Sequence, residues 1–299
     1  MTRHDVGKVA ARRTPSLFGR KSENSRVEAS PRREGVVISS QVLGNFRKPW
    51  SVDRLRGQAA NTREGPVDER SGGRLHTAVV AIGQPRRAED WGRTVCTACR
   101  DALDGVDSVG LVLHSTGFLV DLVGCSDSLA EQAEDAQIVV GEGPGPSAYS
   151  TGTVVRATAG SDAFEPWPML AHEAARLGVG AVIALPLRVG GLRIGRLDLY
   201  RRQPGGLSTE VETDAMLLAE LISYTLIEDF ALREPGADPL ATTHRDVNIA
   251  TGMIAAQRGI SLEEAFLRLR AFAFAAERSL PEVARGVLER RVDLDGATE

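Results

Sequence analysis

Apolar residues recur at three- and four-residue spacing in three short segments near the C-terminal end, and this spacing predicts three amphipathic helices. The first helix is expected over Asp246–Arg258, and Gly259 directly after it is suited to the left-handed conformation that ends a helix. Two capping boxes, in which a glutamate follows a serine by three residues, predict the starts of the other two helices: Ser261 with Glu264, and Ser279 with Glu282. Three helices with one apolar side each are expected to share a small core.

The second of these segments divides clearly into an apolar and a polar side. Its apolar stripe consists of Ala265, Phe266, Leu269, Ala273 and Phe274. Its opposite side carries Arg268 and Arg270. In the first segment, Gly252 occupies the interior of the predicted helix, where a glycine costs about 1 kcal/mol relative to alanine. A close backbone approach or a contact surface would account for a glycine at this position.

The middle of the chain, residues 88–230, alternates between helical and strand patterns. Glycine turns at Thr116-Gly117 and Gly190-Gly191 join two pairs of strands, which predicts hairpins and an antiparallel sheet. The strands are expected at Ser108–Ser115, Phe118–Val123, Ala181–Val189 and Leu192–Tyr200, with helices at Ala88–Leu103 and 210–229. We therefore predict an α+β fold, in which helices flank an antiparallel sheet and a small three-helix domain follows. The apolar side of the helix at 210–229 either covers this sheet or forms a dimer surface.

Composition is typical of a soluble protein with two domains: 299 residues, 42% hydrophobic and 25% charged. No apolar run approaches the ~18 residues that span a bilayer, and the N-terminal residues lack the apolar core of a signal peptide. We expect a cytoplasmic protein that does not contact a membrane. The 3 cysteines are too few and too unevenly spaced for a secreted disulfide framework.

Charge is unevenly distributed along the chain. Residues 1–75 contain 16 Lys and Arg against 8 Asp and Glu, whereas the remainder contains 20 against 32. Apolar residues are sparse in this basic segment and follow no period, so we expect residues 1–75 to be disordered. Such an arm either contacts RNA or an acidic partner through its charge, or is a solvated extension.

Residue types that often carry chemistry do not assemble into a recognisable catalytic or metal site. The five histidines lack metal-ligand spacing, and His114, at a strand end, is the one best placed to face a pocket. Cys96 and Cys99 form a C-x-x-C on a helix, which core packing explains; a cluster with Cys125 would need a fourth ligand. No Ser-His-Asp grouping can be assigned. We expect no cofactor, no metal and no enzymatic activity.

The C-terminal segment resembles the ANTAR domain, an RNA-binding antitermination module of bacterial signalling proteins. The resemblance covers residues 245–288 and rests on these positions: Val247, Ala250, Gly252, Met253, Ala265, Leu269, Arg270, Ala273, Val283 and Ala284. It implies binding of paired RNA stem-loops by two copies of the domain, which stabilises an antiterminator. We place this domain at 241–293.

The middle region resembles the GAF domain, a small-ligand or regulatory sensor fold. The resemblance rests on Val139–Val155 (VVGEGPGPSAYSTGTVV), Trp167-Pro168, Ala184–Leu187 and Ile194-Gly195. Related sequences often have a cysteine where Gly145 stands here, so thiol chemistry at this turn is not expected. The glycines at 141, 143 and 145 are not followed by the Gly-Lys-Ser/Thr of a phosphate loop, and a tight turn explains them. A ligand pocket is expected to involve His114, Glu142, Gly143 and Trp167.

Taken together, these features predict a signal-responsive antitermination regulator in which a GAF-like sensor domain (88–230) controls an RNA-binding homodimer through a proline-containing linker (231–240). Its input is an unknown small ligand or an upstream signalling protein. Residues 241–299 hold 8 Arg and no Lys against 9 Asp and Glu, so RNA binding must come from a local surface. The residues expected to form it are Arg245, Thr251, Gly252, Arg258 and Arg270. The alternative is a signalling adaptor whose helical tail binds protein without RNA.

Overall fold

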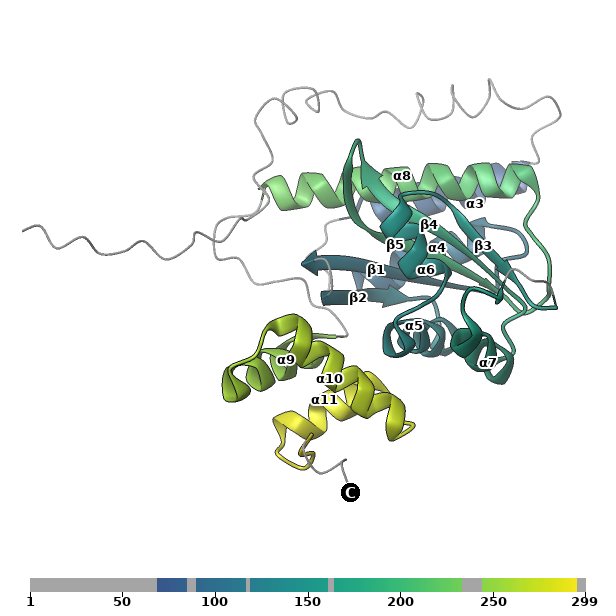
Figure 1. The fold of residues 1–299 in the computed structure, drawn as a ribbon. Helices are drawn as coiled ribbons and strands as arrows, with labels where there is room; N and C mark the ends of the chain where they lie inside the picture. The colour runs from purple at the N-terminus through teal and green to yellow at the C-terminus, as the bar shows by residue number, and fades with distance from the viewer. Residues whose placement is uncertain (1–68, 85–89, 117–118, 161–163, 233–243, 295–299) are drawn as a thin grey trace, which may run out of the picture. The chain divides into compact units, whose positions relative to one another are not determined.

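A computed structural model describes residues 69–84, 90–116, 119–160, 164–232 and 244–294 (Figure 1). We call the described residues from 69 to 232 the sheet domain and those from 244 to 294 the three-helix unit. The expected disordered arm, up to residue 68, and most of the expected linker, from residue 233, lie outside the described residues. Within the described part of the chain, no helix combines the length and apolar character that crossing a membrane requires.

The sheet domain is built on one antiparallel sheet of five strands in the order β2-β1-β5-β4-β3. The strands are β1 (Ser108–Thr116), β2 (Leu119–Cys125), β3 (Val155–Thr158), β4 (Ala181–Val189) and β5 (Leu192–Arg201). Both predicted hairpins are confirmed, and Gly190 in the turn between β4 and β5 has the left-handed φ of 59° that a tight turn requires. The sequence pattern did not indicate β3.

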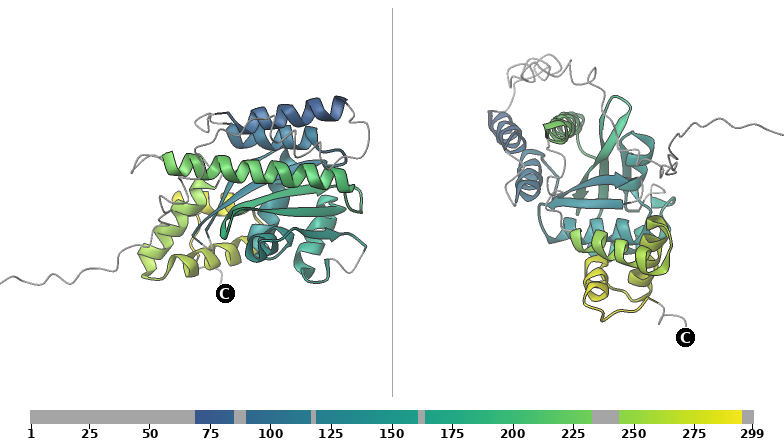
Figure 2. Two further views of the ribbon diagram at one scale, coloured as in Figure 1. Left: turned by 90° about the horizontal axis from the view of Figure 1, so that it is seen from above. Right: turned by 90° about the vertical axis from the view of Figure 1, so that its left-hand side faces the viewer.

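Helices cover both faces of this sheet, as Figures 1 and 2 show. One face carries α3 (Glu69–Ile82), α4 (Trp91–Ala102) and α8 (Thr209–Leu232), and the other carries α5 (Ser128–Val140), α6 (Pro144–Thr151) and α7 (Pro168–Leu177). Side chains of β5 alternate between them. Leu197 and Leu199 point to the α4 and α8 side, whereas Arg196 and Asp198 point to the α5 and α6 side.

The first helix of the sheet domain corrects one expectation. The segment up to residue 75 was expected to be disordered, but α3 begins at Glu69. Two successive glycines in its first turns hide the helical pattern, while Ala78 and Ile82 are fully buried and Arg74 forms a hydrogen-bonded ion pair with Asp104 at 2.8 Å. Tertiary packing therefore overrides a weak local preference. At the other end of the domain, α8 packs against β4 and covers its own sheet.

The three-helix unit consists of α9 (Arg245–Arg258), α10 (Leu262–Ala275) and α11 (Leu280–Leu288). Its predicted ends are confirmed: Gly259 closes α9 with a φ of 65°, and the hydroxyls of Ser261 and Ser279 accept hydrogen bonds from the backbone N–H three residues on. The apolar stripe of α10 was wrong at one position. Phe274 is 49% exposed, so its side chain is not part of the core.

The core of the three-helix unit is continuous with the sheet domain. Buried residues of α9, α10 and α11 form one apolar cluster with Val112, Val120, Leu122 and Ile138. The prediction of a small core shared by three helices alone is therefore incomplete. A unit of about fifty residues has little apolar surface to bury by itself, and the face of β1, β2 and α5 supplies the rest.

Candidate functional site

One face of α9 presents a cation and apolar groups to solvent. Arg245, Ile249, Gly252 and Ala256 follow one another at spacings of four, three and four, so they line the same side of the helix. Arg245 and Ala256 are exposed, and Ile249 is 47% exposed. Two of the five residues expected to bind RNA, Arg245 and Gly252, therefore share a solvent-facing surface. We call these four residues the α9 face.

Gly252 is not explained by packing within the chain. A Cβ built at this position would meet nothing within 4 Å, and its backbone φ does not fall in the left-handed region. The chain therefore accepts the helix-weakening effect of a glycine at a place where alanine would fit. Of the two explanations that the sequence suggested, a close approach within the chain is absent among the described residues.

Two other residues expected to bind RNA lie elsewhere on α9. Thr251 is fully buried, and its hydroxyl donates a hydrogen bond to the carbonyl oxygen of Val247 at 2.7 Å. Arg258 lies in the last turn, half-buried, with its guanidinium 3.7 Å from the carboxylate of Asp293. The structure does not bring these two side chains to the α9 face.

Arg270, the fifth of these residues, contacts the sheet domain. Its Nε donates a hydrogen bond to the carbonyl oxygen of Val139 at 3.1 Å, at the end of α5, and its guanidinium lies 5.8 Å from the centre of the Phe266 ring. The last carbonyls of a helix carry partial negative charge, which favours a cation there. Burial lowers the pKa of Arg270, but an arginine remains charged.

Two further contacts join the three-helix unit to the sheet domain. The carboxylate oxygens of Asp135 on α5 accept hydrogen bonds from the backbone N–H of Leu280, at 3.2 and 3.4 Å, at the start of α11. The amide of Asn248 donates to the carboxylate of Asp121 on β2. Burial raises the pKa of Asp135 to about 7, against the effect of the Leu280 hydrogen bond. Sequence reasoning missed Asp135, since nothing local marks an acidic helix residue as a cap for a distant helix.

On its other side, α5 takes part in a buried charged network. Arg196, which is 1% exposed, donates to Asp198 at 2.9 Å and to Glu134 at 2.8 Å. Gln137 donates to Asp198 at 3.0 Å and to the hydroxyl of Tyr200 at 2.8 Å. Burial, followed by the charge of Asp198, raises the pKa of Glu134 to about 8, so this carboxyl is largely protonated near neutral pH. The remaining Arg196–Asp198 pair is neutral overall, which limits the desolvation penalty.

Glycines make room for this network. A Cβ at Gly110 would lie 2.3 Å from Glu134 Oε1, and a Cβ at Gly145 would lie 2.3 Å from Asp198 Oδ2. The Gly145 N–H also donates to Gln137 Oε1 at 2.8 Å. Gly145, which stands where related sequences often have a cysteine, is therefore required by the charges beneath it. The sequence does contain a signal for this network: Arg196 and Asp198 are opposite charges two residues apart, and they alternate with the apolar Leu197 and Leu199.

The four residues expected to line a ligand pocket are engaged within the sheet domain. His114 stacks on Tyr149 with ring centres 3.5 Å apart, and its Nε2 lies 3.3 Å from an Arg196 nitrogen. Glu142 accepts a hydrogen bond from the backbone N–H of Met169 at 3.1 Å. Gly143 precedes α6 with a φ of 146°, and the half-buried Trp167 precedes α7. Glu142 and Gly143 thus lie in the turn between α5 and α6, and Trp167 lies directly before α7. His114 lies on β1.

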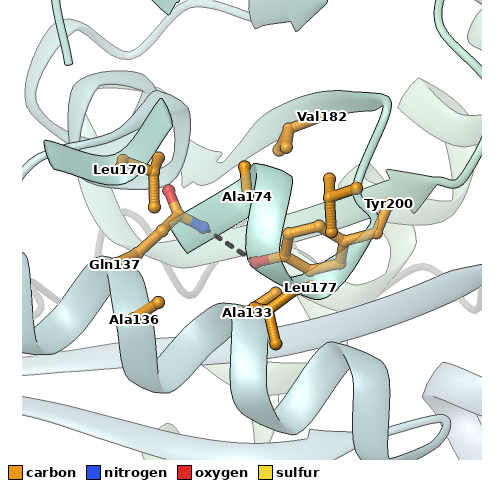
Figure 3. A pocket seen from close by; sticks show the side chains of 9 residues that line it. Ala133, Ala136, Gln137, Leu170, Ala174, Leu177, Val182 and Tyr200 are labelled. Carbon is orange, nitrogen blue, oxygen red and sulfur yellow. Dashed lines mark hydrogen bonds between the residues drawn. The ribbon is translucent and has the colours of Figure 1, made fainter. Parts of the chain in front are cut away.

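A cavity of about 10 Å³ lies beside this network, between α5, α7 and the sheet (Figure 3). Its lining is mainly apolar, with Gln137 and Tyr200 as the polar members. This volume is roughly that of a single water molecule. A small organic ligand would fit this cavity only if the helices around it moved apart.

The cysteines fit the expectation of core packing. Cys96 and Cys99 are fully buried, and all three thiols are free. Burial raises the pKa of Cys99 to about 12, so this thiol stays protonated and unreactive near neutral pH. Among the residues that the structure describes, no group of three or more His, Cys, Asp or Glu side chains is arranged to hold a metal ion.

Comparison with known proteins matches the sheet domain and the three-helix unit to two domain families. The model of the GAF domain family matches residues 77–226, and that of the ANTAR domain matches residues 241–288. No curated protein matches the chain.

Solved structures resemble the sheet domain at low identity. The GAF domain of an Acinetobacter phosphoenolpyruvate-protein phosphotransferase is 14% identical, with a TM-score of 0.42, and the match covers 56% of this chain and 99% of that one. The free methionine-R-sulfoxide reductase of Neisseria meningitidis, in complex with its substrate, is 17% identical, with a TM-score of 0.44, over 57% of this chain and 98% of that one. Likenesses at this level do not indicate a shared ligand or reaction. Because the GAF match spans half of the 299 residues, the chain belongs to the GAF-domain family, and it joins this regulatory domain to an ANTAR domain.

Proposed function

We propose that this protein binds paired RNA stem-loops through its ANTAR domain, as a homodimer, and that its GAF domain controls this binding. The observation that carries the proposal is the match of both domain families on one chain. An RNA-binding antitermination module next to a sensor domain is the arrangement of a transcription regulator. We further propose that the protein acts without catalysis, and that its input is a small ligand or an upstream signalling protein.

The α9 face supports RNA as the partner. Arg245 offers an exposed guanidinium that can pair with phosphate or stack on an unpaired base, and Gly252 leaves the helix backbone open to close approach. The near-neutral charge balance of this domain means that few phosphates are neutralised. We therefore expect a shallow salt dependence of RNA affinity, unlike that of strongly basic nucleic-acid binders.

Two RNA loops bound by two ANTAR domains would compensate for this low charge. Linking two sites raises avidity by roughly 10² to 10⁴ without any new contact. The experiment is a filter-binding titration of the full chain with three RNAs: one with two stem-loops, one with a single stem-loop, and a two-stem-loop control with both loop sequences scrambled. Light scattering reports the mass of each complex. We expect the two-loop RNA to bind most tightly, with two copies of the chain.

The same titration includes a pair of arginine variants. Arg245→Ala removes the exposed cation of the α9 face, whereas Arg268→Ala removes an exposed cation of α10 that pairs with Glu264 at 2.8 Å. We expect the first variant to weaken binding of the two-loop RNA and the second to leave it unchanged. Equal affinity for one and two loops with one copy bound would contradict the dimer, and no preference for either RNA over the scrambled control would contradict RNA recognition.

A signalling adaptor is the second candidate, and one observation favours it. Large apolar side chains are exposed on the ANTAR domain, at 47% for Ile249, 51% for Leu267 and 49% for Phe274. Leu267 and Phe274 are seven residues apart and so lie on one side of α10, and an exposed apolar patch is a feature of protein-binding surfaces. If none of the RNAs is recognised, a protein partner at this surface becomes the better account.

A further inference from the structure

We propose that α5 holds the ANTAR domain in a docked state that sequesters Arg270 on the GAF domain, and that release of this contact is the step that makes Arg270 available to RNA. This inference rests on the proposed function for its RNA readout, but the docked state itself can be measured without RNA. Three observations carry it: the site that holds Arg270, the cap on α11, and the position of α5 between the two domains.

Arg270 occupies a site at the end of α5 that is shaped for it. Its Nε donates to the Val139 carbonyl oxygen, and its guanidinium lies against Gly141, the residue that closes α5 with a φ of 77°. A Cβ at Gly141 would lie 1.6 Å from an Arg270 terminal nitrogen. The absence of a side chain at Gly141 is therefore a condition for this contact. In this position Nε is bonded to Val139 and the side chain is half-buried, so a contact with an RNA phosphate or base competes with docking.

Asp135 anchors the ANTAR domain at a second point on α5. It accepts hydrogen bonds from the first backbone N–H of α11, while Ser279, from the same chain segment as α11, accepts from Glu282. A helix of nine residues thus has one N-terminal donor satisfied by its own cap and another by the GAF domain. Separation of the domains leaves this donor without its acceptor.

The two sides of α5 face different domains. Glu134 and Gln137 point to the buried charged network of the GAF domain, whereas Asp135, Ile138 and the Val139 carbonyl contact the ANTAR domain. Residues 134 and 135 are adjacent, so α5 cannot rotate or slide at one surface without changing the other. An event that disturbs the network, at the Gly145 turn or at Arg196, therefore acts on the contacts of Arg270 and Asp135. This is a physical route from sensor to output that does not depend on the linker.

Docking also buries apolar surface. Val120, Leu122 and Ile138 of the GAF domain are no more than 6% exposed and belong to the same cluster as the ANTAR core. Releasing the ANTAR domain uncovers these residues, which is unfavourable. The docked state is therefore the resting state, and an RNA that contacts Arg270 must bind the minor, released population. The apparent affinity is reduced in proportion to that population.

The test displaces Arg270 without changing any residue of the ANTAR domain. Gly141→Asn places a side chain where the guanidinium lies, and asparagine is among the residues that tolerate a left-handed backbone. Gly190→Asn is the matched control, since Gly190 also has a left-handed φ, of 59°, but a Cβ there meets nothing within 4 Å. Both variants are made in the full chain. A third variant combines Gly141→Asn with Arg270→Ala.

Amide hydrogen exchange and RNA titration are measured on each variant. We expect faster exchange in α10, α11 and the end of α5, and about tenfold tighter binding of the two-loop RNA, for Gly141→Asn but not for Gly190→Asn. Tenfold corresponds to the loss of one charge-assisted hydrogen bond from the docked state. The gain in RNA affinity should vanish when Arg270 is also replaced.

The outcomes separate this inference from the proposed function. Unchanged exchange and unchanged RNA affinity in Gly141→Asn would overturn the docked state. Faster exchange without RNA binding by any variant would support the docked state and refute the proposed function. Faster exchange with tighter binding that persists after Arg270→Ala would show that docking masks a surface other than Arg270, and would overturn the role given to this residue.

Discussion

The Nε of Arg270 donates a hydrogen bond to the carbonyl oxygen of Val139 at 3.1 Å, and so joins the second helix of the ANTAR domain to the end of α5 in the GAF domain. One of the five residues expected from the sequence to bind RNA is thus held by the GAF domain. The hydrogen-bond acceptor of its Nε is a backbone carbonyl 131 positions away in the chain. This arrangement shapes the predictions that follow.

Arg270→Ala should weaken RNA binding most clearly in the Gly141→Asn background. In the native chain the substitution has two opposed effects, because it removes an RNA contact and also loosens docking. With docking already disturbed, only the first effect remains, and we expect a loss of about 1–3 kcal/mol. Filter binding measures this loss, with Arg268→Ala in the same background as the control. Unchanged affinity would remove Arg270 from the RNA-binding surface.

Gly252→Ala should have opposite effects on stability and on RNA binding. Alanine fits without a clash and favours the helix, so the free energy of unfolding should rise by about 0.5–1 kcal/mol. A methyl group on a closely approached surface should lower RNA affinity, with overpacking costing about 1–3 kcal/mol. Gly73→Ala in α3 is the control, since a Cβ there also meets nothing within 4 Å. Urea unfolding and RNA titration of both variants check this, and an unaltered RNA affinity would exclude Gly252 from the contact.

Docking of the ANTAR domain should weaken as pH rises towards 7. Burial raises the pKa of Asp135 to about 7, with smaller increases from Glu131 and Glu282, and the Leu280 N–H acts in the opposite direction. The docked state therefore holds a proton that the solvent-exposed Asp135 releases at lower pH. The free energy of docking is therefore most favourable at low pH. As pH rises to the raised pKa of Asp135, it becomes less favourable by at most about 1.4 kcal/mol per pH unit.

Hydrogen exchange of α11, corrected for the intrinsic effect of pH, measures this dependence between pH 5.5 and 7.5. Asp135→Asn keeps an oxygen acceptor for the Leu280 N–H but cannot ionise in this range. We expect the variant to show no pH dependence of α11 protection. An equal slope in the native chain and the variant would contradict the assignment to Asp135.

The GAF domain should lose stability between about pH 4.5 and pH 8 because of Glu134. Its raised pKa of about 8 means that the folded state binds a proton over a range where the unfolded chain has released it. Stability from this group is present at low pH and falls as pH rises through the window, by at most about 1.4 kcal/mol per unit. Glu134→Gln should flatten the profile, while Glu263→Gln, at an exposed position, should not. Urea unfolding at pH 6 and pH 8 measures the free energy of unfolding of each protein. The same change with pH in the native chain and in Glu134→Gln would refute this prediction.

Gly145→Ala should destabilise the GAF domain. Its Cβ would lie 2.3 Å from Asp198 Oδ2 and 2.5 Å from Arg196 Nε, and neither side chain can move without losing a buried hydrogen bond. We expect a loss of about 1–3 kcal/mol in the free energy of unfolding. Gly191→Ala is the control, because a Cβ there meets nothing within 4 Å. Equal stability of the two variants would contradict the close packing of Gly145 against Arg196 and Asp198.

The three C-terminal helices and the two hairpins of this protein follow from its sequence. Spacings of three and four residues located α9, α10 and α11, because such spacing places apolar groups on one side of a helix. Serine caps and the left-handed Gly259 set their ends, since these interactions span only one turn. The two hairpins could also be predicted, because the alternation of apolar and polar residues and the glycine turns are local features of the sequence. Gly252 is a position of the family resemblance, whereas Arg245 was selected as an arginine available to RNA, and the structure places both on one exposed face.

Only the tertiary structure decided which polar residues are buried and what they contact. Arg196 is buried because Glu134, 62 positions away, and Asp198 satisfy it, and because Gly110 and Gly145 leave space for the charges. Periodicity placed Arg270 on a polar side, but α5 half-buries it. The same reasoning placed Phe274 in the core, but the structure leaves its side chain largely exposed. A helical pattern identifies a face, but the element packed against that face depends on contacts between distant segments.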